Sequence, residues 1–416
     1  AGSSKYDSGW FTMISGCPDN AARTDHTDCF REIEFPDIVK RDFATRDPSM
    51  MDVEVTLRVA DGPNQGFIFK PMGAAPWAMY TTWSTYGGVV AGYNRTHVRL
   101  WAPATTFEHN GAAINLGGGS GAFYGEGSAE LLGEKNVQVS HLLEVRVVVV
   151  PAPSADYDSQ WFPLNAQNGF SSSKLLLHGL MDYPSRVKVV VRAVDGANSG
   201  FIFEAKGDGQ KYRHYGEYGG VVYIYDETSI RVLAPEGRQS ESLSMRGHAI
   251  HIPHGYPSAY RQESMYSEVR VMAWAGNAWE PPTYSTNPNA MSFVRYSGMY
   301  GEHPLELPSM LRPAGRVDAL AFVDNVAGTV GRVPLIGMHG NLAHTYWSAY
   351  SGIAWARNRT NVRAWGPGPD VTRAEWRSAN HVPVRASDGW GGEYNAWYRD
   401  YARTQTFLWE HPQTVQ

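Results

Sequence analysis

The stretch Tyr86-Gly87-Gly88-Val89-Val90 occurs again as Tyr218-Gly219-Gly220-Val221-Val222 and, in altered form, as Tyr350-Ser351-Gly352-Ile353-Ala354. Successive copies begin 132 residues apart, at positions 86, 218 and 350. A second block keeps this spacing, because its final prolines also lie 132 residues apart, in Val98–Pro103, Ile230–Pro235 and Val362–Pro367. Two blocks that hold one spacing twice indicate three copies of one module.

The length of the period indicates whole domains in tandem. Solenoid repeats of about 20 to 50 residues cannot bury a core alone, whereas roughly 130 residues can. The break at Pro151-Ala152-Pro153-Ser154 and the pair Pro281-Pro282 help to place the boundaries. We therefore predict three modules, at residues 1–150, 151–275 and 276–416. The stretches Leu143–Val150 and Glu268–Trp274 are expected to be the closing strands of the first two.

Alternation of apolar and polar residues predicts strands. In Val53–Val59 the odd positions are apolar and the even ones polar, which is typical of a strand with one face in a core and one in water. Val187–Arg192 repeats this pattern, with Val190 as an exception. An Asp-Gly turn follows each stretch, at Asp61 and at Asp195. The chain is therefore predicted to be all-β, with one antiparallel β-sandwich in each of three tandem modules of about 132 residues.

The composition is typical of a secreted globular protein. Charged residues make up 19% and aromatic residues 12%, and the 43 Gly and 25 Pro suit many strands joined by tight turns. A net charge of −5 without a basic stripe argues against a nucleic-acid partner. No window approaches 18 consecutive apolar residues, so we expect no membrane span. The start at Ala1 without Met is what a processed secreted protein would show, although a trimmed sequence would look the same.

One part of the repeat resembles a known family. The stretch Pro184-Ser185-Arg186-Val187-Lys188-Val189, followed by an Asp/Asn turn and a Gly-Phe strand, is similar to the middle of H-type lectin modules. These are small six-stranded sandwiches of secreted invertebrate proteins. The resemblance covers about a third of each module and implies a sandwich fold and sugar binding. No ligand residue of that family can be matched to this chain, so none is assigned.

Two repeated residues are candidates for a binding role, the Tyr of the first block and the Arg of the second. An aromatic face can pack on sugar C–H groups, and a guanidinium can bind an anionic glycan. Both also have a structural interpretation, in which the Tyr packs beside glycines that allow close backbone approach and the Arg makes a fixed fork to a carboxylate or to carbonyls. Because the fold is what every copy must share, we expect a scaffold role for Tyr86, Tyr218, Tyr350, Arg99, Arg231 and Arg363.

Two covalent features are also predicted. Cys17 and Cys29, the two cysteines of the chain, are expected to form a disulfide that closes a short loop, with free thiols or a metal site as the alternative. Asn94 and Asn358 begin N-x-Thr sequons that lie 264 residues apart, twice the period, whereas Asp226 takes this place in the second module. We expect exposed, glycosylated turns at Asn94 and Asn358, although Asn and Asp also suit plain turns.

Signatures of catalysis are missing from the sequence. It contains no nucleophile elbow, P-loop, dinucleotide-binding glycine pattern or zinc-protease motif. His248, His251 and His254 are three residues apart, but their surroundings predict a strand and a turn, where this spacing sends neighbours to opposite faces. We therefore expect no catalytic residue, no metal and no cofactor.

Repeated modules without catalytic motifs favour a secreted, non-enzymatic structural or adhesive protein. The 14 Trp and 23 Tyr are more than three small cores need, so some are expected at module or subunit interfaces. The predicted partners are copies of the same chain or other extracellular proteins, with glycans as a further class. Head-to-tail contacts would then give filaments or matrix. The alternative is a multivalent lectin whose weak sites gain avidity by linkage. A glycan-active or metal-dependent enzyme is a third interpretation.

Overall fold

The computed structural model describes most of the first 275 residues and strand segments beyond them. The described residues are 6–18, 28–62, 64–73, 84–106, 109–115, 123–124, 139–166, 172–205, 211–212, 218–235 and 247–275, followed by 305–306, 316–323, 331–334, 341–343, 348–351, 354–358, 361–367, 380–381 and 402–409. Statements below about what is present or missing refer to these ranges.

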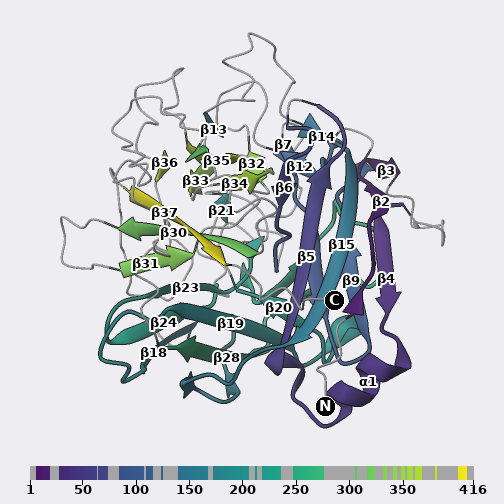
Figure 1. Ribbon diagram of the computed structural model, residues 1–416. Helices are drawn as coiled ribbons and strands as arrows, with labels where there is room; N and C mark the ends of the chain where they lie inside the picture. Colours follow the sequence, from purple (N-terminus) through teal and green to yellow (C-terminus); the bar gives the residue numbers. More distant parts are fainter. Residues whose placement is uncertain are drawn as a thin grey trace, which may run out of the picture.

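The first large sheet joins strands from the beginning and the end of the chain. The long antiparallel strands β5 and β15 form its centre and lie side by side in Figure 1. Its nine strands are β1 (Tyr6–Asp7), β2 (Phe11–Ile14), β15 (Leu142–Pro151), β5 (Met51–Val59), β6 (Ile68–Phe69), β34 (Ala354–Arg357), β35 (Asn361–Pro367), β29 (Leu305–Glu306) and β13 (Phe123–Tyr124).

Two further large sheets also combine distant parts of the chain. The second sheet has eight strands, β16 (Tyr157–Asp158), β17 (Phe162–Pro163), β28 (Ser267–Trp274), β19 (Arg186–Ala193), β20 (Ile202–Glu204), β8 (Val90–Tyr93), β9 (His97–Trp101) and β4 (Phe30–Glu34). The third has six, β18 (Ser173–Leu177), β24 (Ser229–Leu233), β23 (Val222–Tyr225), β31 (Gly331–Pro334), β30 (Arg316–Val323) and β37 (Ala402–Trp409).

The remaining elements are short. The small sheets contain β3 (Cys17–Pro18), β10 (Ala104–Thr106) and β11 (His109–Asn110); β12 (Ile114–Asn115) and β14 (Val139–Ser140); β21 (Lys211–Tyr212), β33 (Ser348–Ser351) and β36 (Asn380–His381); β22 (Tyr218–Gly219) and β25 (Gly247–His248); β26 (Ile250–Ile252) and β27 (Gln262–Ser264); and β7 (Ser84–Tyr86) and β32 (Asn341–Ala343). The helical elements are α1 (Asp37–Ala44), η1 (Pro48–Met50) and η3 (Gly196–Asn198). The predicted all-β class is confirmed, and its large sheets are antiparallel.

Each large sheet is completed at one antiparallel contact between strands from different predicted modules. In the second sheet Tyr93 of β8 pairs with Ile202 of β20, and we call this contact the first junction. The second junction, in the third sheet, pairs Tyr225 of β23 with Arg332 of β31. The closing junction, in the first sheet, pairs Arg357 of β34 with Ile68 of β6.

The three junctions follow the sequence repeat. The residues that pair at β8, β23 and β34 are Tyr93, Tyr225 and Arg357, which lie 132 positions apart. The hairpins behind them keep the same register, because these residues also pair with Val98, Ile230 and Val362. The sheets therefore cross the predicted boundaries after residues 150 and 275, while the division into three tandem modules stays a prediction.

Alternation on β5 agrees with the sequence pattern for most of its length. Val55, Leu57 and Val59 are buried, while Val53 is half-buried and packs on the core. The facing strand β15 buries Val145, Val147 and Val149 in the same way. Full burial of such a side chain contributes roughly 1.5–3 kcal/mol, so the β5–β15 pair is a major source of stability.

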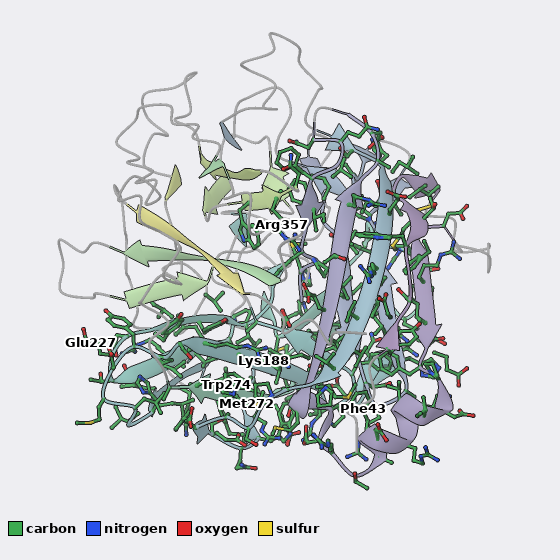
Figure 2. All side chains as sticks on the ribbon, viewed as in Figure 1. Phe43, Lys188, Glu227, Met272, Trp274 and Arg357 are labelled. Carbon is green, nitrogen blue, oxygen red and sulfur yellow. A yellow bond between two sulfur atoms is a disulfide. The ribbon has the colours of Figure 1, made fainter. Side chains whose placement is uncertain are left out.

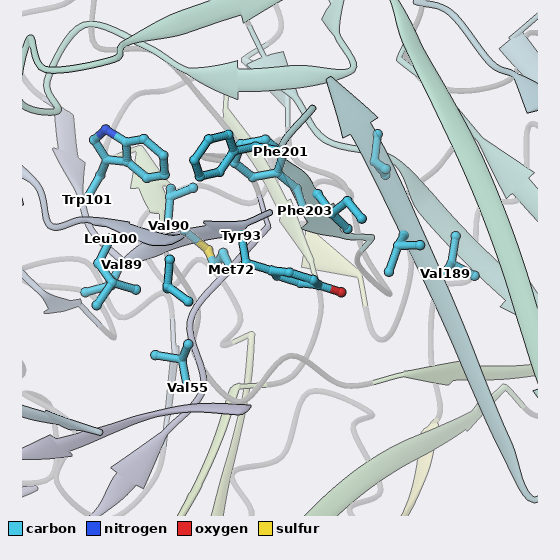
Figure 3. Close-up of a cluster of buried hydrophobic side chains, with 14 of the residues drawn as sticks. Val55, Met72, Val89, Val90, Tyr93, Leu100, Trp101, Val189, Phe201 and Phe203 are labelled. Carbon is cyan, nitrogen blue, oxygen red and sulfur yellow. The ribbon is translucent and has the colours of Figure 1, made fainter. Parts of the chain in front are cut away.

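One buried cluster continues across the first junction (Figure 3). It contains Val55 of β5 and Val90 of β8 together with Val189 of β19 and Phe203 of β20. The rings of Trp101 and Phe203 are stacked with centroids 6.3 Å apart, although they come from the two sides of the junction. The first two predicted modules therefore share a core instead of contacting each other through a solvated surface.

Candidate functional site

Glycines of the repeated Tyr-Gly-Gly block have a backbone role. Gly88 and Gly220, which lie 132 positions apart, both have a left-handed φ, of 98° and 94°. Gly219 lies so close to His251 that an added Cβ would come within 2.2 Å of the His251 Cβ. Only glycine meets both demands without strain. The strands that hold Tyr86, Tyr218 and Tyr350 are described, but the positions of these three side chains fall outside the described part.

Arg99 links β9 to a loop of the second predicted module. Its Nε donates to Glu32 Oε1 at 2.7 Å, and its Nη1 donates to the Ala197 carbonyl at 3.0 Å and to Asn198 Oδ1 at 2.9 Å. The guanidinium also stacks on the Tyr260 ring at 3.4 Å. Arg99 is only 8% exposed, so this fork orients two segments rather than reaching solvent.

The other repeated arginines occupy equivalent backbone positions. Arg99 pairs with Gly92, Arg231 with Ile224 and Arg363 with Ala356, each arginine 132 positions after the previous one. Arg231 is half-buried, and the side chain of Arg363 falls outside the described part. The scaffold role of all three thus stays a prediction, for which Arg99 provides the detailed contacts.

The predicted covalent features lie at the edge of the fold. Cys17 and Cys29 form a disulfide with their Cα atoms 6.1 Å apart, as the sequence predicts. Asn94 lies in the turn between β8 and β9, where its Oδ1 accepts from the Thr96 and His97 backbone N–H groups, both at 2.8 Å. The side chains of Asn94 and Asn358 are part-exposed. Their glycosylation stays a prediction.

Asp226 makes the same turn in the second predicted module. Its Oδ1 accepts from the backbone N–H groups of Thr228 at 2.8 Å and Ser229 at 2.7 Å. Burial raises the pKa of Asp226, but these hydrogen bonds outweigh it and hold the pKa below its usual value. Asn and Asp can both accept these bonds, which explains why the turn survives while the sequon does not.

The histidine-rich stretch is part of small strands. His248 of β25 and His251 of β26 are buried, and their rings are stacked with centroids 5.6 Å apart, whereas His254 is exposed. Among the described residues no group of three His, Cys, Asp or Glu side chains is arranged to hold a metal ion.

A buried ionic network spans the first and second predicted modules beneath the first junction. Arg186 of β19 donates to both carboxylate oxygens of Asp52, at 2.9 and 2.6 Å. Lys188 Nζ donates to the Met51 carbonyl at 2.5 Å and lies 3.3 Å from Asp52 Oδ1. Lys188 is 6% exposed and lies on the lower sheet near Trp274 in Figure 2. Burial lowers the pKa of Lys188, and the charge of Asp52 opposes this shift.

The network continues through the η1 turn. Arg270 of β28 donates to both carboxylate oxygens of Asp158 and, at 2.9 Å, to Ser49 Oγ. Asp47 caps η1 and accepts from the Trp161 indole N–H at 2.8 Å. Each buried charge therefore has an opposite charge and hydrogen bonds, which burial of ions requires.

Sequence reasoning did not find this network. Alternation placed Lys188 on a water-facing side of its strand, but Lys188 and Val190 are both buried because residues 49–52 cover that face. The exception at Val190 was the available signal, since an apolar residue at a polar position indicates a strand that is covered on both faces.

A polar pocket opens beside this network, between the first and second sheets. Its volume is about 70 Å³, which is room for several water molecules. Besides apolar side chains, the lining includes Asp52, Glu54, Lys70, Tyr93, Arg186 and Glu204. Carboxylates, cations and a phenol in one small space can form directed hydrogen bonds to a polar ligand.

Tyr93 is the distinctive group of the pocket. Its side chain is 4% exposed, and its hydroxyl has no hydrogen-bond partner among the described residues. Burial raises the pKa of Tyr93 well above its usual value, and the nearby Glu204 and Asp52 carboxylates raise it further. The phenol therefore stays protonated at neutral pH and can donate to an acceptor that enters the pocket.

The helices of the described residues are too short or too polar to cross a bilayer. No protein family, curated protein or solved structure matches this chain. The likeness to H-type lectin modules therefore stays a prediction.

Proposed function

We propose that this chain is a secreted, non-enzymatic structural or adhesive protein of extracellular material that associates with its own copies. In this proposal it consists of three tandem β-sandwich modules at residues 1–150, 151–275 and 276–416. The supporting observation is the set of three junctions, at which a strand of one module completes a sheet of another. A contact between two different surfaces of a unit is heterologous, so it can join units in a closed ring or in an open array.

Two features support the extracellular part of the proposal. The Cys17–Cys29 disulfide suits an oxidising compartment. Asn94 lies in a part-exposed turn that a glycan could occupy. Intact mass before and after glycosidase treatment of native protein tests this, with mass loss expected at Asn94 and Asn358 and none at Asp226. Unchanged mass would remove the glycoprotein claim.

Light scattering after size-exclusion chromatography tests self-association. We expect the mass to rise above the 46.1 kDa of one chain as concentration increases, and electron microscopy of native material to show head-to-tail arrays. A monodisperse monomer at high concentration, with no oligomer in the source material, would overturn the structural function.

A multivalent lectin is the second candidate, and the polar pocket is the observation that favours it. The buried Tyr93 hydroxyl and the surrounding carboxylates suit a hydroxyl-rich ligand. Weak sites on linked modules would gain avidity on a surface with many sugars. Glycan-array binding with competition by free sugar tests this, and Tyr93→Phe should weaken any binding that uses the pocket. Binding that is unchanged by Tyr93→Phe would place the sugar site elsewhere.

A further inference from the structure

We propose that the closing junction is also formed between two copies of the chain, β34 of one copy pairing with β6 of the next. This inference rests on the proposed self-association and names the surface that produces it. The partner is a second copy of this chain, and the product is a head-to-tail polymer in which each copy gives the end of its chain to the first sheet of its neighbour.

Equivalence of the three junctions is the first argument. The pairing of Arg357 with Ile68 uses the register that pairs Tyr93 with Ile202 and Tyr225 with Arg332. The first and second junctions join residues 109 and 107 positions apart, between modules that follow each other in the chain. The closing junction joins positions 68 and 357, which are 289 apart. It is the junction that can open while all three modules stay linked in order.

The closing junction is one of three pairings between the first and third predicted modules. Strand β7 pairs with β32, where Thr85 faces Leu342, and β13 pairs with β35, where Phe123 faces Pro367. These pairings hold the same two parts of the chain together. A second copy offers the same strands in the same order, so all three can be remade between copies.

Opening this region would expose groups that need cover. Phe69 is 1% exposed, Trp355 2% and Ala356 0% in the closed chain. The open chain would also leave strand edges with free backbone hydrogen-bonding groups, which readily pair with another chain. Closing again or joining another copy satisfies the same groups, and a higher protein concentration favours the second outcome.

Charges explain why this junction opens rather than the first. The first junction lies over the buried network of Lys188, Arg270 and their carboxylates, so separating it would strand buried charges. Among the described residues of the closing junction, the recorded ionic contact is Lys70 Nζ over the Trp355 ring at 5.7 Å. A single cation over an aromatic ring restrains the region far less.

Cysteine pairs test the proposal directly. Ile68 and Arg357 are opposite each other in an antiparallel pair, a distance that a disulfide can span. Ile68→Cys and Arg357→Cys are made as separate full-length proteins, one with a tag that changes its mass. The native Cys17 and Cys29 are already bonded to each other. After mixing at high concentration with a mild oxidant, we expect a disulfide-linked heterodimer of about twice 46.1 kDa.

The control pair comes from strands within one module. Thr56 and Arg146 face each other in β5 and β15, and both are part-exposed. A mixture of Thr56→Cys and Arg146→Cys should give no heterodimer above the level of random collision. Should Ile68→Cys or Arg357→Cys fail to fold by circular dichroism, Thr85→Cys and Leu342→Cys at the β7–β32 pairing serve the same purpose.

The double variant Ile68→Cys/Arg357→Cys separates this proposal from the general one. Oxidised at low concentration, it should lock the chain closed and abolish concentration-dependent assembly, and reduction should restore assembly. Assembly that persists in the locked protein, without heterodimer in the mixture, would overturn exchange at the closing junction and leave self-association standing. A wild-type chain that never assembles would overturn both.

Discussion

The first junction and the closing junction use one strand register for two different situations. At the first, Tyr93 and Gly92 pair with Ile202 and Phe203 above a network of buried ion pairs. At the closing junction Arg357 pairs with Ile68, and the recorded cation contact is Lys70 over Trp355. The repeat therefore supplies the strand pairing, while side chains outside it decide which junction is permanent.

Removing the carboxylate of Asp52 should have the largest effect. In Asp52→Asn, Lys188 loses the charge that its Nζ approaches at 3.3 Å while remaining buried. We expect the free energy of unfolding to fall by about 3–5 kcal/mol. Lys70→Met at the closing junction should cost about 1 kcal/mol or less. Urea unfolding of both variants measures the difference between the two junctions.

Glu144→Gln is the matched control for a carboxyl-to-amide change. Glu144 Oε2 lies 2.7 Å from Arg58 Nε, but both side chains are about a third exposed. Such pairs contribute about 1 kcal/mol or less. Equal losses in Asp52→Asn and Glu144→Gln would mean that the buried network does not distinguish the first junction.

Gly73→Ala should have the next largest effect, because Gly73 touches the backbone of β20. An added Cβ would lie 1.7 Å from the Glu204 carbonyl oxygen, so the two modules would have to separate locally. Overpacking of this kind costs about 1–3 kcal/mol. In Gly92→Ala the Cβ would meet the Phe203 ring at 2.5 Å, and a side chain can move more easily than a strand. Thermal unfolding should thus show the greater loss for Gly73→Ala.

A smaller effect, spread over a range of pH, should come from Asp47 and Asp158. Burial raises the pKa of both, but hydrogen bonds, from Ser49 and Trp161 to Asp47 and mainly from Arg270 to Asp158, and the Arg270 charge hold each below its usual value of 3.8. A carboxyl with a lowered folded-state pKa stabilises above 3.8 and loses that contribution as the pH falls below it. Urea midpoints between pH 5 and pH 2 should fall more steeply for wild type than for Asp158→Asn. Parallel curves would show that these carboxyls do not stabilise the first junction.

The sequence pattern predicted the strands better than their partners. Alternation predicted β5 and β19, and apolar runs predicted the closing strands β15 and β28, because burial of one face or both is written in local sequence. The helix α1 was not predicted, although Pro36 followed by Asp37 is a signal for a helix start.

Strand partners depend on distant residues, so local patterns could not predict the junctions. Nothing near Tyr93 indicates that Ile202 will face it, and nothing near Lys188 indicates that Asp52 will cover it. The repeat spacing indicated that some contact would recur three times, but not that it would lie between modules. The polar pocket was missed for the same reason, since its lining comes from strands that meet only after folding.

The length of chain between Ile68 and Arg357 also affects synthesis. A ribosome adds about 5–20 residues each second, so the edge of β6 waits roughly 15 to 60 s for β34 to emerge. During that time β5, β6 and β15 can already be folded. Neighbouring nascent chains on one messenger would present finished β34 strands to unfinished copies, so the crowding of ribosomes could decide how many chains begin joined and how many begin alone.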